Sequence, residues 1–330
     1  MASGLAPAAL CRPATINIAL STGHPMPLHL ETPLIESVPL SLASGRSIFL
    51  KMEALQPPGS FKIRGVGAAC EHHAQNGKRR FVSSSGGNAG MAVAYAGRLL
   101  SIPVSVFVPE TTTERAKSLI GQQGAEVIVH GAAWDEANAE ALASVDAETA
   151  FIHPFDDPLL WTGHATVIDE VVRSGLAFDA VVLSVGGGGL FAGVAEGLRR
   201  NGLQQVPIFA VETEGTASLA ASIEAGALVE LASVSGIATS LGARKVSDRA
   251  FELSRTRPVE SVVVSDADAA SACMRFLDDH RVLVEPACGA ALSLAYAHAD
   301  RLAGYERVLI IACGGATTTV ERLQAWQASY

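Results

Sequence analysis

Short apolar runs rich in β-branched residues alternate with alanine-rich helical stretches from Ser47 onward. This alternation predicts a doubly wound α/β fold, because each helix returns the chain so that successive strands pair in parallel. The unbroken apolar runs AVVLSV and VLIIAC are typical of strands buried on both faces, so we expect these two at the centre of a sheet. The predicted strands are SIFLKME, RFVSS, VSVFVPE, EVIVHG, AFIHP, AVVLSVG, IFAVE, SVVVSD and RVLIIACGG.

Part of this pattern is predicted to form a lobe of its own. The units between Phe81 and Ile152 make a self-contained group, with helices predicted over 88–100, over 113–122 and from Trp134, while another helix is predicted over 268–280. We expect a small lobe at 63–152 and a large lobe made of 29–62 and 153–330. Ligands of open α/β sheets bind outside the carboxyl ends of the strands, so glycine-rich segments there are the candidate sites.

Composition excludes several classes of partner. The 330-residue chain is 49% hydrophobic and 17% charged, which is enough apolar material for two compact lobes. A net charge of −9, with scattered lysines and arginines, argues against nucleic acid as a partner. No apolar run is long enough to cross a bilayer. The expected ligand is therefore a small molecule, bound away from any membrane.

The cysteines and the first residues bear on the compartment. The five cysteines are an odd number without CxxC spacing, which argues against a disulfide framework and against a zinc site, and favours a reducing cytoplasm. Residues 1–28 contain one arginine and no acidic residue, but no secretory apolar segment. We expect a disordered tail or an upstream start codon there rather than a transit peptide.

One lysine lies in a segment whose prolines and glycines predict a rigid turn around its side chain. In EALQPPGSFKIRGVG, Lys62 stands between Phe61 and Ile63, in a predicted turn opened by two prolines and Gly59 and closed by Gly65. Prolines fix the approach of the chain, and glycines let the backbone come close to another group. A surface lysine at the start of a helix is the alternative.

Three predicted strands end in glycine-rich segments, and the first of these is SVGGGGLFAG. The consecutive glycines Gly186, Gly187, Gly188 and Gly189 allow several backbone N–H groups to converge on a phosphate at a helix N-terminus. The segment also satisfies the dinucleotide pattern GxGxxG/A through Ala192, with Glu212 at a distance suited to a ribose hydroxyl. Taken alone, it leaves the two kinds of phosphate ligand open.

The other two segments are SSSGGNAGMAVAYAG and IIACGGATTT. In the former, Ser85 and the N–H groups near Asn88 could receive a carboxylate, although an ordinary helix cap uses the same residue types. In the latter, Cys313 leaves a buried strand beside two glycines. A presented lysine, a phosphate loop without a lysine and a separate carboxylate loop suit pyridoxal 5′-phosphate (PLP) with an amino-acid substrate better than they suit NAD.

Six segments resemble those of the fold-type II PLP enzymes, in particular the animal-type L-serine/L-threonine dehydratases. They are GSFKIRG, SSSGGNAG, SVGGGGL, FDDPLLWTGHA, VLVEPACGAAL and ACGGA, in this order. The resemblance covers the chain from about Leu28 to its end. It implies a tryptophan synthase β-like α/β fold with two doubly wound lobes, PLP between them, a homodimer, and elimination of water from L-serine or L-threonine. Serine racemisation on the same scaffold is the alternative.

The resemblance also implies roles for individual residues. Lys62 would form the Schiff base with PLP, Phe61 would lie against the pyridine ring and Cys313 would face its nitrogen. The cofactor's 3′-oxygen would bond to Asn88, and its phosphate would lie on Gly186–Gly189, with Ser240 also in the cofactor site. The substrate carboxylate would be received by Ser85, Gly86, Gly87, Asn88 and Ala89. Ser85 or the cofactor phosphate would protonate the leaving hydroxyl.

Two further implications concern a cation and a departure from relatives. The family binds a monovalent cation, expected to be K⁺, and the matching positions here are Glu212, Thr216, Ser218, Leu241 and Ala243. The alternative for Glu212 is a carboxylate that caps a helix. Many mammalian relatives have alanine where this chain has Gly86, so we expect a looser carboxylate loop and a lower rate on serine.

Overall fold

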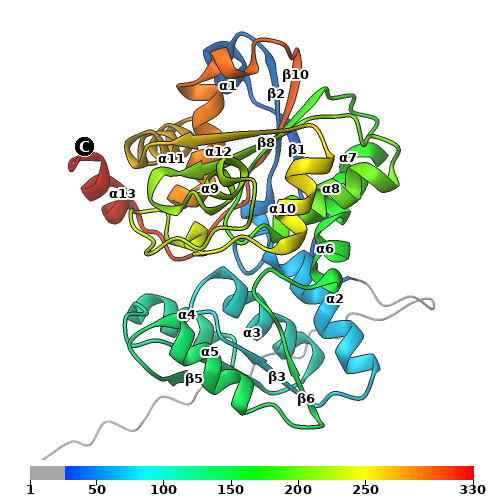
Figure 1. Ribbon diagram of the computed structural model, residues 1–330, viewed down its shortest axis with the longest axis vertical. Helices are drawn as coiled ribbons and strands as arrows, with labels where there is room; N and C mark the ends of the chain where they lie inside the picture. The colour runs from blue at the N-terminus through cyan, green and yellow to red at the C-terminus, as the bar shows by residue number, and fades with distance from the viewer. Residues whose placement is uncertain (1–26) are drawn as a thin grey trace, which may run out of the picture.

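The computed structural model describes residues 27–330, and its strands form two separate sheets (Figure 1). The larger sheet has the order β1 (Leu34–Glu36), β2 (Ser47–Lys51), β10 (Arg307–Ile311), β7 (Ala180–Ser184), β8 (Ile208–Thr213) and β9 (Val259–Val264). The smaller has the order β5 (Glu126–Val129), β4 (Val104–Val108), β3 (Arg80–Ser83) and β6 (Thr149–Phe151). Only β1 and β2 pair antiparallel, so the predicted α/β fold with mostly parallel sheets is confirmed. The predicted tail at 1–28 lies outside the described residues apart from its last two positions.

The centre of the large sheet is the pair that the apolar runs predicted. Strands β10 and β7 are neighbours, with Val308 opposite Ala180 and Ile310 opposite Val182. Every residue of β7 is buried, as is every residue of β10 after Arg307. Strand β1 was not predicted: it has three residues and pairs with β2 at the edge of the sheet.

Helices cover both faces of the large sheet (Figure 1). Helix α12 packs against β7 and β8, and α8 packs against β7. The helices of this half are α1 (Val38–Ser44), α7 (Thr166–Arg173), α8 (Gly189–Arg200), α9 (Ser218–Ala225), α10 (Asp248–Thr256), α11 (Asp266–His280), α12 (Pro286–Tyr296) and α13 (Val320–Gln327). Short 3₁₀ turns lie at η1 (Glu53–Leu55), η2 (Glu214–Thr216), η3 (Thr239–Leu241) and η4 (Ala299–Leu302).

The smaller sheet packs with α3 (Asn88–Leu100), α4 (Glu114–Gln122) and α5 (Trp134–Ala143). Helices α2 (Lys62–Gln75) and α6 (Pro158–His164) contact each other at the junction of the two halves, and α2 continues along the smaller half against α3 (Figure 1). Ile63 and Val66 of α2 and Leu160 of α6 belong to the same apolar core as Phe81 of β3. Leu160, which lies beyond the predicted boundary of the small lobe at residue 152, therefore shares a core with residues inside that lobe.

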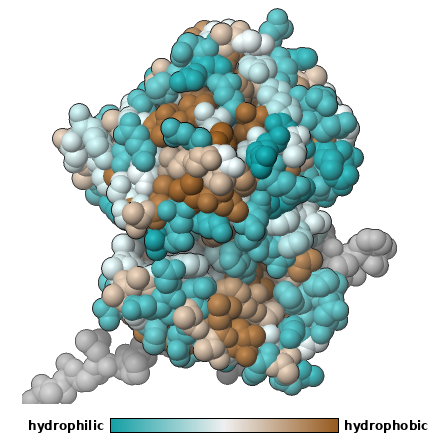
Figure 2. All heavy atoms as spheres, in the orientation of Figure 1, coloured by the Kyte–Doolittle hydropathy of each residue, from teal (hydrophilic) through white to brown (hydrophobic). Residues whose placement is uncertain are grey.

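The surface narrows to a waist between the two halves of the molecule (Figure 2). Among the residues that the structure describes, no helix is both long enough and apolar enough to cross a membrane.

Candidate active site

Lys62 is the first residue of α2, at the point where the chain leaves the large sheet. The turn before it is fastened to the segment after β10: Ser60 forms a β-bridge with Gly314, and the Phe61 N–H donates to the Cys313 carbonyl at 3.1 Å. The prediction that Gly65 closes this turn was wrong, because Gly65 lies inside α2. A Cβ at this position would come within 2.5 Å of the Leu160 carbonyl, so glycine is needed for the contact between α2 and α6.

The environment of Lys62 favours a neutral amine. Burial lowers the pKa of Lys62 to about 8, although the nearby Cys313 and Glu285 oppose this shift. Nζ donates a hydrogen bond to the Pro154 carbonyl at 2.6 Å and lies 5.2 Å from the centre of the Phe61 ring. A lysine that is partly deprotonated near neutral pH is suited to attack an aldehyde.

The four glycines form a loop between β7 and α8. Gly188, the residue before α8, has φ +93°, a left-handed conformation that favours glycine. No residue of the described chain accepts a hydrogen bond from the N–H groups of Gly186, Gly187, Gly188 and Gly189. These donors at a helix N-terminus are a ready site for a phosphate. Phe155 lies against Gly187 and Gly189.

Asn88 connects the two halves of the molecule. It begins α3, and its Nδ2 donates to Glu285 Oε1 at 2.6 Å and lies 3.5 Å from the Ser240 hydroxyl. Its Oδ1 accepts from the Ala316 N–H at 3.2 Å. The glycine loop is next to this group, since a Cβ at Gly186 would lie 3.2 Å from the Ser240 carbonyl oxygen. The structure thus brings Asn88, Ser240 and the glycine loop together.

The predicted carboxylate loop runs from Ser85 to Ala89 between β3 and α3. Ser85 Oγ accepts a hydrogen bond from the Gly87 N–H at 3.3 Å. The N–H groups of Asn88 and Ala89 have no acceptor within the described chain, as expected at the start of a helix. A Cβ at Gly86 would lie 2.7 Å from Thr112 Cγ2, so Thr112 already fills the space that an alanine here would use. The structure records no hydrogen bond from Ser85 to Lys62.

Cys313 lies just beyond β10 and is 7% exposed. A hydrogen bond with Cys288, together with burial, raises the pKa of the Cys313 thiol well above its usual value. The thiol is therefore uncharged at neutral pH.

Of the predicted cation ligands, Glu212 lies in β8, and Thr216 and Ser218 follow shortly after this strand. Glu212 is fully buried, and its two oxygens accept from the Leu219 and Ala220 N–H groups, each at 2.8 Å. Glu212 therefore caps α9, which was its alternative role. Burial raises the pKa of Glu212 to about 7 against the effect of these two bonds. Ser218 Oγ is buried without a hydrogen-bond partner in the described chain.

The remaining predicted ligands have other partners. Thr216 shares a hydrogen bond of 2.9 Å with Thr213, and the Leu241 carbonyl accepts from the Ala243 N–H at 2.7 Å. Among residues 27–330, no three His, Cys, Asp or Glu side chains are grouped closely enough to hold a metal ion.

Sequence reasoning missed several residues near Lys62. Glu285 is 4% exposed, and burial raises its pKa to about 7 despite hydrogen bonds from Ser240, Asn88 and Thr317. Glu285 is the one charged residue in the apolar segment VLVEPACGAAL, and this contrast with its neighbours could have marked it as a candidate site residue. Pro154 contributes only a carbonyl oxygen, and Phe155 acts through contact with glycines, so neither residue type gave a signal.

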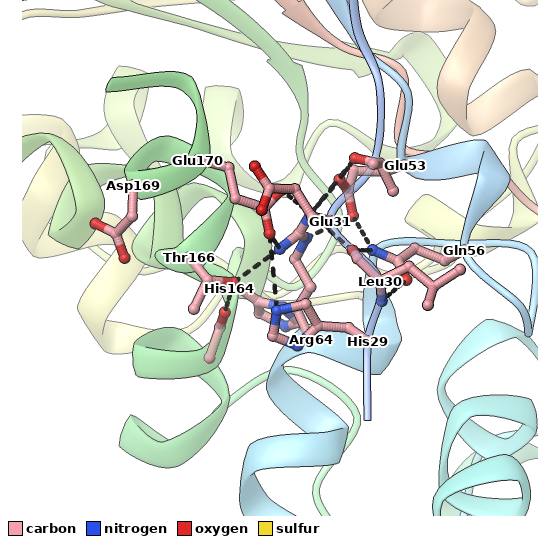
Figure 3. Close-up of polar contacts among 12 residues, drawn as sticks. His29, Leu30, Glu31, Glu53, Gln56, Arg64, His164, Thr166, Asp169 and Glu170 are labelled. Carbon is pink, nitrogen blue, oxygen red and sulfur yellow. Dashed lines mark hydrogen bonds and ion pairs between the residues drawn. The ribbon is translucent and has the colours of Figure 1, made fainter. Parts of the chain in front are cut away.

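A buried ion network surrounds Arg64, which lies two residues after Lys62 in α2 (Figure 3). Arg64, which is 1% exposed, donates to both oxygens of Glu53 and to both oxygens of Glu170, at 2.6–2.8 Å. Lys51 Nζ also lies 2.5 Å from Glu170 and 2.6 Å from the Thr32 carbonyl. Two cations and two anions therefore balance in a space without solvent, and they join α2 to η1, β2 and α7.

These residues fit PLP. Lys62 supplies an amine with a lowered pKa, the four unpartnered N–H groups of the glycine loop suit a phosphate, and Cys313 supplies a neutral polar group. The fold and the site define a fold-type II PLP enzyme. The chain belongs to the family described as "Pyridoxal-phosphate dependent enzyme", whose sequence pattern matches residues 26–314.

Individual relatives and one solved structure show which members of this family the chain resembles. A protein named "Serine dehydratase-like" from Mus musculus is 46% identical, over 90% of this chain and 94% of its own length. The "L-serine dehydratase/L-threonine deaminase" of Homo sapiens is 43% identical, over 91% of this chain and 94% of its own length. The crystal structure of a fungal L-serine ammonia-lyase from Rhizomucor miehei superposes with a TM-score of 0.88 at 37% identity, covering 92% of this chain and 100% of that one.

Proposed function

We propose that this protein is a lyase that removes water from L-serine, and from L-threonine, and releases an enamine. Water then hydrolyses the enamine to pyruvate or 2-oxobutyrate together with ammonia. The observation that carries the proposal is the meeting of a lysine of lowered pKa, a loop of unpartnered N–H groups and a neutral thiol at the carboxyl ends of β7 and β10. Relatives that match more than nine-tenths of their own length bear names for this reaction.

When bound, PLP supplies an aldehyde that condenses with amines and a ring that withdraws electrons from the substrate's Cα. Lys62 would hold the cofactor and, once released, take the proton from Cα. The N–H groups of Gly186–Gly189 would hold the phosphate, and those of Asn88 and Ala89 the substrate carboxylate. The Cys313 thiol would leave the pyridine nitrogen uncharged. Ser85 is our candidate for donating a proton to the departing hydroxyl, because it borders the carboxylate loop.

We also propose that a monovalent cation, K⁺ in particular, binds at Glu212 with Thr216, Ser218, Leu241 and Ala243. The buried carboxylate and the unpartnered Ser218 hydroxyl support this site. We propose as well that the protein is a homodimer and is located in the cytoplasm. It is supported by the apolar patches on both halves of the face in Figure 2 and by four buried free cysteines in the described chain.

The experiment that tests the activity compares the purified protein with its Lys62→Ala variant. We expect the wild type, loaded with PLP, to form pyruvate from L-serine in a lactate dehydrogenase-coupled assay. Reduction with borohydride should fix PLP to the peptide that contains Lys62, as detected by mass spectrometry. Lys62→Ala should lose both the adduct and more than about a thousandfold of the turnover.

Lys78→Ala is the matched control, since the Lys78 side chain lies on the surface and its one hydrogen bond within the described residues is to the Ala147 carbonyl. This variant should keep both properties. A borohydride-stable PLP adduct in Lys62→Ala would contradict the role of Lys62. Conversion of L-serine to D-serine without pyruvate would replace the lyase with a racemase.

A further inference from the structure

Glu285 is an acidic side chain that is buried beside the predicted cofactor residues and has no role in the function proposed above. It lies directly before α12 and is 4% exposed. Its Oε1 accepts from Asn88 Nδ2 at 2.6 Å, and its Oε2 accepts from Thr317 Oγ1 at 3.4 Å. The short bond to Asn88 is the stronger of these contacts.

The Asn88 side-chain amide is held from two sides. Its Nδ2 donates to Glu285, while its Oδ1 accepts from the Ala316 N–H. Because an amide has donors at one end and an acceptor at the other, these two bonds fix the direction in which it faces. The second hydrogen on Nδ2 has only the Ser240 hydroxyl within the described chain, at the limiting distance of 3.5 Å. That hydrogen is free for an acceptor on a bound ligand.

The same bonds join the two halves of the molecule. Asn88 begins α3, which packs on the small sheet, whereas Ala316 follows β10 of the large sheet and Glu285 precedes α12, which packs on that sheet. A ligand acceptor placed at Asn88 would therefore meet a donor whose position depends on both halves.

We propose that Glu285 is a positioning residue, which holds the Asn88 amide so that its remaining N–H faces the cofactor. The inference rests on the proposed function only for the identity of that cofactor as PLP. The role requires an acceptor oxygen and not a negative charge. It agrees with the raised pKa of Glu285, because a protonated carboxyl still keeps one oxygen as an acceptor.

The test measures the dissociation constant of PLP from the apoprotein, by quenching of tryptophan fluorescence, in a double-mutant cycle. Glu285→Gln keeps an acceptor oxygen, whereas Glu285→Leu has a similar volume and none. We expect Glu285→Leu to weaken PLP binding about 10- to 100-fold and Glu285→Gln to weaken it less than about threefold. In the Asn88→Ala background, Glu285→Leu should have almost no further effect.

Thermal unfolding of each apoprotein shows whether the variants fold, and Glu285→Ala replaces Glu285→Leu if leucine does not fit. If Glu285→Gln binds PLP as weakly as Glu285→Leu, charge rather than hydrogen bonding is responsible and the inference is overturned. Full additivity of Glu285→Leu and Asn88→Ala overturns it as well. A wild type that binds PLP but forms no pyruvate contradicts the proposed reaction alone, because the affinities still decide the role of Glu285.

Discussion

At the scale of single residues, the pKa of Lys62 has a measurable consequence. Its lowering from 10.5 to about 8 means that the neutral amine, which is the nucleophile, is already abundant at pH 8. The rate at which PLP becomes linked to the apoprotein should therefore rise about tenfold per pH unit below pH 8 and level off above it. Borohydride trapping at successive times and pH values measures this rate.

The control for that profile is N-acetyl-lysine amide, whose rate should go on rising toward the ordinary lysine pKa. A rate for the protein that also continues to rise beyond pH 9.5, roughly one and a half units above the lowered value, would show that Lys62 titrates as an exposed lysine.

Gly86 offers a second test at this scale. Alanine at this position would place its Cβ 2.7 Å from Thr112 Cγ2 and 2.8 Å from Thr112 Oγ1, so Thr112 must move. We expect Gly86→Ala to cost about 1–3 kcal/mol in the free energy of unfolding, and to raise KM for L-serine because it displaces the loop that would receive the carboxylate. In Gly86→Ala/Thr112→Ala the space is clear, and the stiffer loop should give a higher kcat/KM than Thr112→Ala alone.

Steady-state kinetics of Gly86→Ala, Thr112→Ala and the double variant measures these changes in KM and kcat/KM. A double variant no better than Thr112→Ala would show that the freedom of glycine at this position does not limit the rate.

Residues with a distinctive chemical type were the ones that sequence could identify as candidates. Lys62, the run of glycines and Cys313 were identifiable because their types and surroundings are unusual. The structure added Glu285 and the carbonyl of Pro154, whose significance depends on which segments meet in space. Contacts between residues about 200 positions apart, such as Asn88 and Glu285, cannot be read from local pattern.

At the scale of elements, the start of α2 depends on the buried ion network (Figure 3). Arg64→Met would leave Glu53 and Glu170 with only Lys51 as a cationic partner, so we expect a loss of about 3–5 kcal/mol in the free energy of unfolding. Urea denaturation monitored by circular dichroism measures this loss.

The matched variant is Arg64→Met/Glu53→Gln, which removes one charge of each sign and leaves the Lys51–Glu170 pair. It should recover part of the lost stability. If the single variant unfolds like the wild type, the network does not stabilise the protein.

Strands were predicted well where both of their faces are buried, because such strands have an unbroken apolar run in the sequence. The nine strands that were expected all occur, and the expected helix from Asn88 begins and ends as predicted. Strand β1 escaped because an edge strand of three residues, with one exposed residue, has too little periodicity to detect. Gly65 was misread because a glycine needed for helix contact looks the same in sequence as a glycine needed for a turn.

At the scale of the whole molecule, the raised pKa of Glu212 couples stability to pH and to cations. A carboxyl whose pKa is about 7 in the folded state and 4.5 in the unfolded state binds more protons when folded. Stability from this group is therefore full below pH 4.5 and is lost, by up to ~3 kcal/mol, as pH rises through 7. A bound K⁺ would favour the carboxylate and reduce the loss.

We therefore expect the unfolding midpoint at pH 7.5 to be higher in KCl than in tetramethylammonium chloride at equal ionic strength. Glu212→Gln should remove most of that difference. Calorimetric midpoints that are equal in the two salts would exclude the proposed cation site.

The pairing of β2 with β10 determines which sheet can be completed first during synthesis of the chain. All four strands of the small sheet lie between residues 80 and 151, so they can pair while the ribosome is still making the rest of the chain. Strand β2 can pair early with β1, but its other edge pairs with residues 307–311 and must wait until these have emerged. During that interval Lys62 has already been made, but Cys313 and Gly314, which hold the turn before it, have not. The nascent chain can therefore complete its cofactor site only after residue 314 has emerged.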